Sequence, residues 1–360
     1  MRSSARVDCP CCAQPGGQLY TALKDRLFGV AGVWDFRRCS RGECGTLWMD
    51  PCPVPEDIGE AYINYYTHSD AAAASQRSRR PMLLRLPRRI WRTLSKRTLR
   101  PLRQQSEAGY RAVVYKDPLA AATSWQKLLY PLFYLFPLPR AHVDFSYMFI
   151  PVAAGKRLLE VGFGGGVTLG LMSARGWLAE GIDFDEAAVA NARAKGMTVN
   201  AGDIRAQQYP DASFDAIVSS HVIEHLHDPV GFLQECRRVL KPGGQLVLAT
   251  PNAGSFGRGL FGASWFALDP PRHLLIFTEA SLQASAGKAG FATGKTRHNA
   301  RDADSVFCAS RNIAVQGVHR WGDTGNHWRQ TWTRALQMVE WLAVCFKPSL
   351  AEELVIIFKK

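Results

Sequence analysis

The residues with the clearest chemical potential lie in "RLLEVGFGGG", residues 157–166, where an acid precedes a run of glycines. The apolar residues around Glu160 predict a short buried strand, and the glycines predict a tight turn with a helix to follow. Because glycine has no side chain, its backbone can approach a ligand closely and can adopt positive φ angles. The pattern therefore predicts a ligand-binding loop at the end of a strand.

The spacing of these glycines narrows the class of ligand. A P-loop requires Lys followed by Ser or Thr after its glycines, and no such pair follows here. A dinucleotide loop reads Gly-x-Gly-x-x-Gly, whereas the spacing here is Gly162-x-Gly164-x-Gly166 with Val at position 167. The remaining class is the S-adenosylmethionine loop, in which an acid such as Glu160 precedes Gly-x-Gly-x-Gly.

Acidic residues also follow the next two predicted strands, and ligands of open α/β sheets bind at the carboxyl ends of strands. Asp183 ends the second strand, where a carboxylate can accept hydrogen bonds from both ribose hydroxyls. Phe184 offers an apolar face to an adenine ring, and Asp185 is better placed than Asp183 to cap the following helix. After the third strand, Asp203 can accept the exocyclic amine of adenine and Ile204 can pack on the ring, although a turn aspartate explains this pair equally well.

Three histidines are candidates for a catalytic base that would take a proton from an acceptor hydroxyl. His221 follows the fourth predicted strand, and His225 comes four residues later. His273 lies in "LDPPRHLLIF", in an insertion after the fifth strand where a substrate lid is expected. A structural role is an equal alternative for His273, and for Glu224 and His225 we favour packing at a helix start.

Six of the nine cysteines fall within the first 52 residues. In a reducing compartment, clustered cysteines are more often metal ligands than disulfides. Two pairs have the spacing to close one tetrahedral zinc site of a structural kind, and these ligands are Cys9, Cys12, Cys39 and Cys44. Cys11 and Cys52 are substitutes, and reduced thiols without a metal are the alternative.

These residues require a framework of alternating strands and helices. Strands are predicted near residues 157–161, 178–182, 197–200, 214–219 and 244–250, with a last strand in the terminal "EELVIIFKK". Helices are predicted at residues 166–175, 185–195, 228–240 and 278–289. Strands that alternate with helices of this length imply a parallel sheet with helices on both faces.

Composition divides the 360 residues into three regions. Residues 1–55 are a zinc-ribbon-like module, and residues 56–150 are a basic and aromatic helical linker. Residues 151–360 hold the α/β domain, with a lid insertion at about 251–277 and a helical insertion at about 302–348. No signal peptide is recognisable.

The formal net charge of +13 is concentrated in residues 77–103, which contain ten Arg, one Lys and no acid. Leu and Ile recur there at helical spacing, so a basic helix with an apolar face could lie on an anionic membrane surface. The run "LLYPLFYLFPL" at 128–138 would add apolar anchorage, but it is shorter than the roughly 20 residues of a membrane span. We therefore expect a cytoplasmic protein, with peripheral contact between residues 77–138 and the inner membrane face as an option. A solvated basic face is the plain alternative, and nucleic acid is less favoured because aromatic residues do not interleave with the arginines.

Five stretches resemble, in this order, a class I S-adenosylmethionine-dependent methyltransferase: "LLEVGFGGG", "GIDFD", "GDI", "SFDAIVSSHVIEHLHDP" and "VLKPGGQLVLATPN". The N-terminal cysteines, "MDPCPVPEDIGEAYINYY" and the stretch from "TPNAGSF" to "FTEASL" are similar to a subfamily with a four-cysteine zinc motif. That subfamily often occurs among bacterial envelope-polysaccharide and natural-product genes. Phe163 departs from the family, which usually has a small residue or Cys there, and residues 77–150 match it poorly.

The resemblance implies a Rossmann-like seven-stranded sheet that binds S-adenosylmethionine. The positions that would line the cofactor are Glu160, Gly162, Phe163, Gly164 and Gly166 in the loop, Asp183 and Phe184, Asp203 and Ile204 at the adenine, and His221 near the sulfonium. The first hypothesis is methyl transfer to a small-molecule, sugar or lipid-linked acceptor, at oxygen, in envelope-polysaccharide or natural-product biosynthesis. The alternatives are an RNA methyltransferase that uses the basic segment, and a non-catalytic adaptor that docks through the zinc module. The complete set of Glu160, Asp183 and Asp203 argues against the adaptor.

Overall fold

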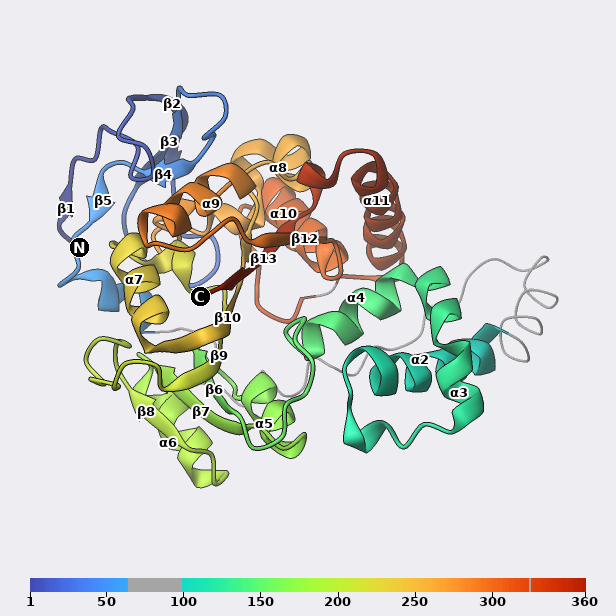
Figure 1. Cartoon of the computed structure of the whole chain (residues 1–360). Helices are drawn as coiled ribbons and strands as arrows, with labels where there is room; N and C mark the ends of the chain where they lie inside the picture. Colours follow the sequence, from blue (N-terminus) through green and yellow to red (C-terminus); the bar gives the residue numbers. More distant parts are fainter. Residues whose placement is uncertain (64–98, 324) are drawn as a thin grey trace.

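A seven-stranded sheet forms the centre of the computed structural model, which describes residues 1–63, 99–323 and 325–360 (Figure 1). Its strand order is β12-β13-β10-β9-β6-β7-β8, and only β13 runs antiparallel to its neighbours. The strands are β6 (Arg157–Val161), β7 (Leu178–Asp183), β8 (Val199–Ala201), β9 (Phe214–Ser220), β10 (Leu240–Pro251), β12 (Lys295–Asn299) and β13 (Glu353–Lys359). The predicted Rossmann-like sheet is confirmed.

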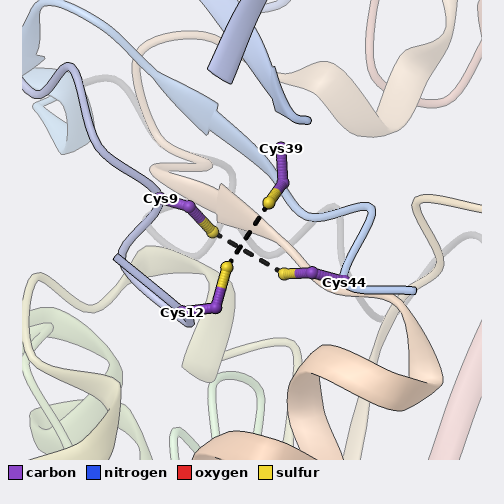
Figure 2. A group of neighbouring side chains, drawn as sticks. All are labelled: Cys9, Cys12, Cys39 and Cys44. Carbon is purple, nitrogen blue, oxygen red and sulfur yellow. Dashed lines mark hydrogen bonds between the residues drawn. The ribbon is translucent and has the colours of Figure 1, made fainter. Parts of the chain in front are cut away.

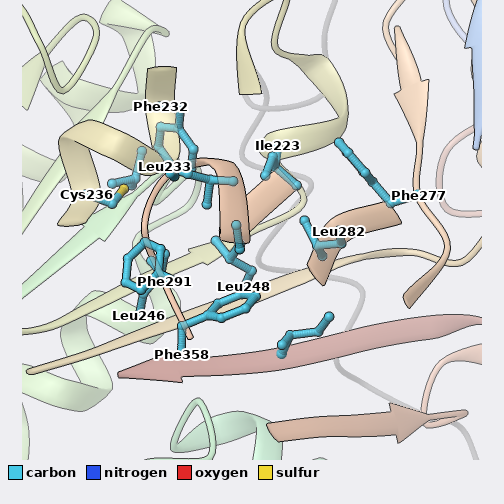
Figure 3. Close-up of a cluster of buried hydrophobic side chains, with 14 of the residues drawn as sticks. Ile223, Phe232, Leu233, Cys236, Leu246, Leu248, Phe277, Leu282, Phe291 and Phe358 are labelled. Carbon is cyan, nitrogen blue, oxygen red and sulfur yellow. The ribbon is translucent and has the colours of Figure 1, made fainter. Parts of the chain in front are cut away.

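One face of the sheet is covered by α7 (Pro229–Val239) and α9 (Glu279–Lys288), which pack on each other. Their apolar side chains meet alternate residues of the strands in one buried cluster (Figure 3). Among its members are Phe232, Leu233 and Cys236 from α7, Leu282 from α9, and Leu246, Leu248 and Phe358 from the sheet. Because side chains alternate across a strand, the residues between these point to the opposite face.

The opposite face is covered by the region that the sequence presents as a linker. It contains α2 (Arg100–Val114), α3 (Ser124–Leu129) and α4 (Pro137–Ser146). Aromatic side chains of this region, including Tyr110 and Tyr147, form one buried cluster with Leu158, Val218 and Val247 of the sheet. These helices therefore share a buried core with the central sheet and do not merely connect two regions of the chain.

Local capping explains where the remaining helices begin. Asp185 accepts hydrogen bonds from the amides of Ala187 (2.9 Å) and Ala188 (3.3 Å), as predicted, and starts α6 (Glu186–Ala194). Helix α5 (Val167–Ala174) follows the glycine loop directly. Helix α7 ends at Val239 because Pro242 cannot continue it, and β10 already begins at Leu240, with a register shift before Gln245. The strand therefore starts four residues earlier than predicted.

The N-terminal region contains a sheet that the sequence did not predict. Its strands are β2 (Gly16–Leu23), β3 (Trp34–Cys39) and β4 (Leu47–Met49), beside a short pair of β1 (Ser3–Ser4) and β5 (Cys52–Pro53). The fourth strand of this sheet, β11 (Leu275–Ile276), comes from the predicted lid and pairs with β4. The N-terminal module and the lid are thus one folded unit.

Helices make up much of the region after β10. It contains α8 (Phe256–Phe261) in the lid, and α10 (Ala303–Gln316) and α11 (His327–Phe346) between β12 and β13. Strand β12 was also not predicted, because "KTRHN" has no apolar alternation and lies at the sheet edge. Within the described ranges, no helix is both long enough and apolar enough to cross a membrane. The predicted basic helix of residues 77–98 lies outside the described residues.

Candidate functional site

The glycine loop connects β6 to α5 at the carboxyl edge of the sheet. Gly162 has φ 74° and donates its amide hydrogen to the carbonyl of Ile182 at 2.8 Å. A Cβ at this position would lie 2.2 Å from Cγ2 of Val222, so a side chain is excluded both by conformation and by space. Gly164 also has a positive φ of 49°, but nothing lies within 4 Å of its Cβ position. The loop is therefore packed at its base and open at its tip.

Glu160 lies at the base of this loop and is buried. Its Oε2 atom has no hydrogen-bond partner among the described residues. Burial, followed by the charge of nearby Asp183, raises the pKa of Glu160 to about 8. A buried carboxyl oxygen without a partner is costly, so this position suits a ligand that brings a cation or a hydrogen-bond donor.

Asp183 ends β7 and holds the tip of the glycine loop. Its Oδ2 accepts the amide of Gly164 at 2.8 Å, and its Oδ1 accepts the amide of Asp185 at 3.0 Å. Burial raises the pKa of Asp183 despite these hydrogen bonds. The next side chain, Phe184, is 66% exposed, which leaves an aromatic face open beside the loop.

The other predicted cofactor residues are buried or already paired with neighbouring groups of the protein. Asp203 accepts the backbone amide of Arg205 at 2.8 Å and pairs with its guanidinium at 3.2 Å. Ile204 is buried in the core cluster under α7 and α9. Phe163 points into a buried cluster under α5 and α6, where the absence of a side chain at Gly181 makes room for its ring. Only the backbone of Phe163 therefore faces the loop, which explains how the fold accepts this bulky residue. The cofactor contacts of these residues stay predictions.

His221 is held between two carboxylates. Its Nδ1 lies 3.2 Å from Oε1 of Glu224, and its Nε2 lies 2.9 Å from Oε1 of Glu353 at the start of β13. Burial would lower the pKa of His221, but the hydrogen bonds and charges of these two acids outweigh it and raise the pKa to about 10. An imidazolium cannot accept a proton, so this arrangement favours an electrostatic role over that of a base.

His225 and His273 face each other, with ring centroids 4.6 Å apart. Nδ1 of His225 lies 3.0 Å from the carbonyl oxygen of Arg272, and Nδ1 of His273 lies 2.7 Å from that of Ala267. Because a carbonyl only accepts, these two contacts place a hydrogen on each Nδ1. Burial, and then the charge of His273, lower the pKa of His225 to about 4, so its ring is neutral at pH 7.

The two rings and Glu224 form one group of chemical interest. One ring nitrogen from each histidine and one oxygen of Glu224 lie within 4.8 Å of one another. Oε2 of Glu224 accepts a hydrogen bond from the hydroxyl of Thr250 at 3.0 Å. Such a group can hold a proton, and its ligand types also suit a divalent metal. The structure thus brings together two of the predicted catalytic histidines, and Glu224 connects them to the third.

Tyr62 belongs to this site and was missed by sequence reasoning. Its hydroxyl lies 2.9 Å from Nδ1 of His225, and burial, followed by the charge of Asp269, raises its pKa. The charge of Asp183 contributes to the same shift in pKa. The only signal was its place in "EAYINYY", which sequence reasoning used for the resemblance alone.

Arg272 connects the histidines to the N-terminal module and was also missed. It is fully buried, and its guanidinium binds Asp25 of the module at 2.8 and 2.9 Å and Asp269 of the lid at 2.5 to 3.1 Å. Its carbonyl oxygen is the partner of His225, and His273 is the next residue. The module therefore fixes the segment that carries one candidate base and orients the other.

The four predicted cysteine ligands converge at one end of the module (Figure 2). The sulfur atoms of Cys9 and Cys44 lie 3.7 Å apart, and those of Cys12 and Cys39 lie 3.4 Å apart. In a tetrahedral zinc site with bonds of about 2.3 Å, the sulfurs lie about 3.8 Å apart, so the spacing fits. Cys11 and Cys52 are buried outside this group, and the thiol of Cys11 faces Thr46 and Ser285. The lid contacts the same end, because the Thr278 hydroxyl donates to the carbonyl of Cys44 at 2.5 Å.

Comparison with known families agrees with this geometry. Residues 159–248 match the family described as "Methyltransferase domain". A Mycolicibacterium smegmatis protein named "Probable S-adenosylmethionine-dependent methyltransferase" is 41% identical over 108 residues, which are 29% of this chain and 42% of that protein. A ubiquinone biosynthesis O-methyltransferase of Pseudomonas aeruginosa is 38% identical over 106 residues, which are 28% of this chain and 46% of that protein. Residues 159–248 are therefore similar to a methyltransferase domain, and the chain spans less than half the length of these relatives.

A solved S-adenosylmethionine-dependent methyltransferase from Mesorhizobium loti is similar over 61% of this chain and 98% of its own. The sequence identity is 17% and the TM-score is 0.42.

Proposed function

We propose that this chain is an S-adenosylmethionine-dependent methyltransferase that transfers a methyl group to oxygen of a small-molecule, sugar or lipid-linked acceptor. The observation that carries the proposal is the buried Glu160, whose Oε2 lacks a partner in the described ranges beside an open glycine loop. The loop lies in the segment that matches a methyltransferase domain. A non-catalytic descendant of the fold would have no need to keep a costly unpaired acid there.

The cofactor pocket follows from the chemistry of the residues present. Glu160 is placed to bind the ammonium group of the methionine part, because a cation would compensate its buried charge. Asp183 has acceptor capacity left beyond its two amide bonds and would take the ribose hydroxyls. Phe184 offers its exposed ring to the adenine. When bound, the cofactor supplies a methyl group already activated by its sulfonium.

The acceptor side is formed by the lid. The pKa of His225 is lowered, so its Nε2 offers a lone pair at neutral pH and can take the proton that an acceptor hydroxyl loses. His273, whose ring lies beside it, is the second candidate for this role. The imidazolium of His221 stabilises the buried Glu224 behind them. A base of this kind is needed for oxygen methylation, and the similarity to ubiquinone biosynthesis O-methyltransferases supports the same acceptor atom.

We also propose that Cys9, Cys12, Cys39 and Cys44 bind one structural zinc ion. Four thiolates leave no open position on zinc, so the ion would stabilise and not react. The module has only a small core of its own, and a metal would supply the stability that this core lacks. Because β4 of the module pairs with β11 of the lid, that stability extends to the segment with His273.

The direct test is calorimetric titration of the purified protein with S-adenosylmethionine, beside Asp183→Ala. We expect saturable binding that is lost in the variant, because the ribose contact and the anchor of Gly164 disappear together. Asp211→Ala, which removes a carboxylate that is 78% exposed, is the matched control and should bind like the wild type. A folded wild type that does not bind the cofactor would contradict the catalytic proposal and favour the adaptor.

A further inference from the structure

Helix α11 is built with its polarity reversed relative to an ordinary surface helix. The side chains that it buries are polar: Thr333, Gln337 and Glu340. Its exposed side chains include five large apolar ones that recur at helical spacing along one face: Trp328, Met338, Val339, Leu342 and Phe346. We call this last set the outer stripe. Phe346 is 89% exposed and Trp328 is 74% exposed.

The orientation of α11 is fixed by directed hydrogen bonds on its inner face. Gln337 donates from Nε2 to the carbonyl oxygens of Ala300 at 2.9 Å and Arg301 at 2.7 Å. Glu340 accepts the amide of Glu352 at 2.8 Å, at the start of β13. A rotated helix would bury the apolar stripe but would break these bonds to the edge of the sheet. The outward position of the stripe is therefore specified by the fold.

Cations outnumber acids on α11 and in the residues that flank it: Arg320, Arg329, Arg334 and Lys347 against Asp323 and Glu340. Arg334 lies 3.8 Å from Asp304 of α10. Glu340 is the only acid of α11, and burial followed by the charge of Glu352 raises its pKa, which favours its neutral form. Exposed cations stand at both ends of the helix, Arg320 before it and Lys347 after it. An apolar face with cationic margins and terminal aromatic residues is the pattern of a helix that lies in the interface of an anionic membrane.

The same insertion exposes further apolar side chains outside α11. Val315 at the end of α10, and Val318 and Trp321 in the following turn, are exposed apolar side chains of the same insertion. Large exposed apolar surfaces are uncommon on soluble monomers and mark interaction sites. In Figure 1, α11 lies on the opposite side of the view from the N-terminal module, so the stripe is separate from the zinc site.

We propose that α11 docks flat on the surface of an anionic lipid membrane through the outer stripe, with Met338, Leu342 and Phe346 in the acyl boundary. The inference deepens the proposed function, because a membrane-bound enzyme would meet a lipid-linked acceptor at its own surface. The docking itself depends only on the helix and does not require the proposed catalysis.

The test is co-sedimentation of the full chain with vesicles of phosphatidylcholine alone and with vesicles that also contain phosphatidylglycerol. The test variant is Leu342→Glu/Phe346→Glu. The matched control is Val7→Glu/Val33→Glu, which adds the same charge at two exposed apolar positions of the N-terminal module. We expect binding that requires phosphatidylglycerol, weakened about tenfold or more in the test variant and about twofold or less in the control.

Three outcomes would overturn the proposal: no binding of the wild type to anionic vesicles, equal weakening in both variants, or binding indifferent to phosphatidylglycerol. A wild type that dimerises in solution through the stripe, without binding vesicles, would assign the stripe to a second copy instead. If the glutamate variant does not fold, Leu342→Ser/Phe346→Ser replaces it. Calorimetry with S-adenosylmethionine on the same preparations separates a failure of docking from a failure of the proposed function.

Discussion

The N-terminal module and helix α11 both lie outside the central sheet, and different kinds of polar contact hold them in place. The module is fixed by buried charges, with Arg272 between Asp25 and Asp269, and it contributes to the lid sheet. Helix α11 is fixed by neutral hydrogen bonds on its inner face and leaves its apolar side outward. In each region the buried polar contacts fix the orientation of another feature. In the module this feature is the segment with the candidate bases, and in α11 it is the outer stripe.

The largest effect is expected when the proposed zinc site is broken. Cys39→Ser, or removal of zinc by a chelator, should lower the melting temperature strongly and release the lid, because metal binding supplies roughly 10 kcal/mol or more in small zinc modules. The measurement combines metal content by mass spectrometry with thermal unfolding followed by circular dichroism. Cys345→Ser is the control, since this exposed thiol lies on α11. A metal-free wild type of unchanged melting temperature would contradict the role of zinc.

The second effect concerns the buried charges between module and lid. Arg272→Met should reduce the free energy of unfolding by about 3–5 kcal/mol, because it leaves Asp25 and Asp269 buried without their cation. Urea denaturation measures the loss. Arg320→Met, at an exposed arginine, should change stability by less than about 0.5 kcal/mol. Equal stabilities of the two variants would mean that the module is not held by this contact.

A smaller effect separates the two faces of α11. Gln337→Leu should cost about 1–3 kcal/mol, because the carbonyl oxygens of Ala300 and Arg301 lose their donor inside the protein. Leu342→Glu, on the outer stripe, should leave the stability of the free protein within about 0.5 kcal/mol of the wild type. The same urea titrations decide this. A larger loss for the outer than for the inner substitution would show that the helix is rotated in solution.

The smallest effect is the pH dependence of cofactor binding, which should be independent of both regions. Because the pKa of free Glu160 is about 8 and a bound ammonium group favours its ionised form, binding should release a proton at pH 7. Affinity for S-adenosylmethionine should then rise by up to about tenfold per pH unit toward pH 8 and level off above it. Calorimetry across this range checks the slope, which Glu160→Gln should flatten and Leu342→Glu should retain. An affinity of the wild type that does not change with pH would contradict the proposed contact between Glu160 and the ammonium group.

Local signals were sufficient for the sheet and for the residues at its carboxyl edge. Apolar runs bounded by Gly, Pro and capping Asp predicted the strands that carry Glu160 and Asp183 near their ends, and paired spacing predicted the four clustered cysteines. Contacts between distant segments had no such signal. The ion pair of Arg272 with Asp25 and the contact of Tyr62 with His225 depend on where the lid folds back, which no local pattern encodes. The edge strand β12 was not predicted, because a strand at the edge of a sheet needs no apolar alternation.

The shared sheet of module and lid has a consequence for the order of events during synthesis. Asp25 and Arg272 are 247 residues apart in the chain. At typical translation rates of about 5–20 residues per second, roughly 12–50 s pass between the emergence of the two side chains. The module therefore spends that interval without its fourth strand and without the counter-ion of a buried acid. For the nascent chain, zinc binding by the four cysteines and docking of the module on the lid would be separate steps. Zinc would have to bind to the three-stranded sheet if it is to bind before docking.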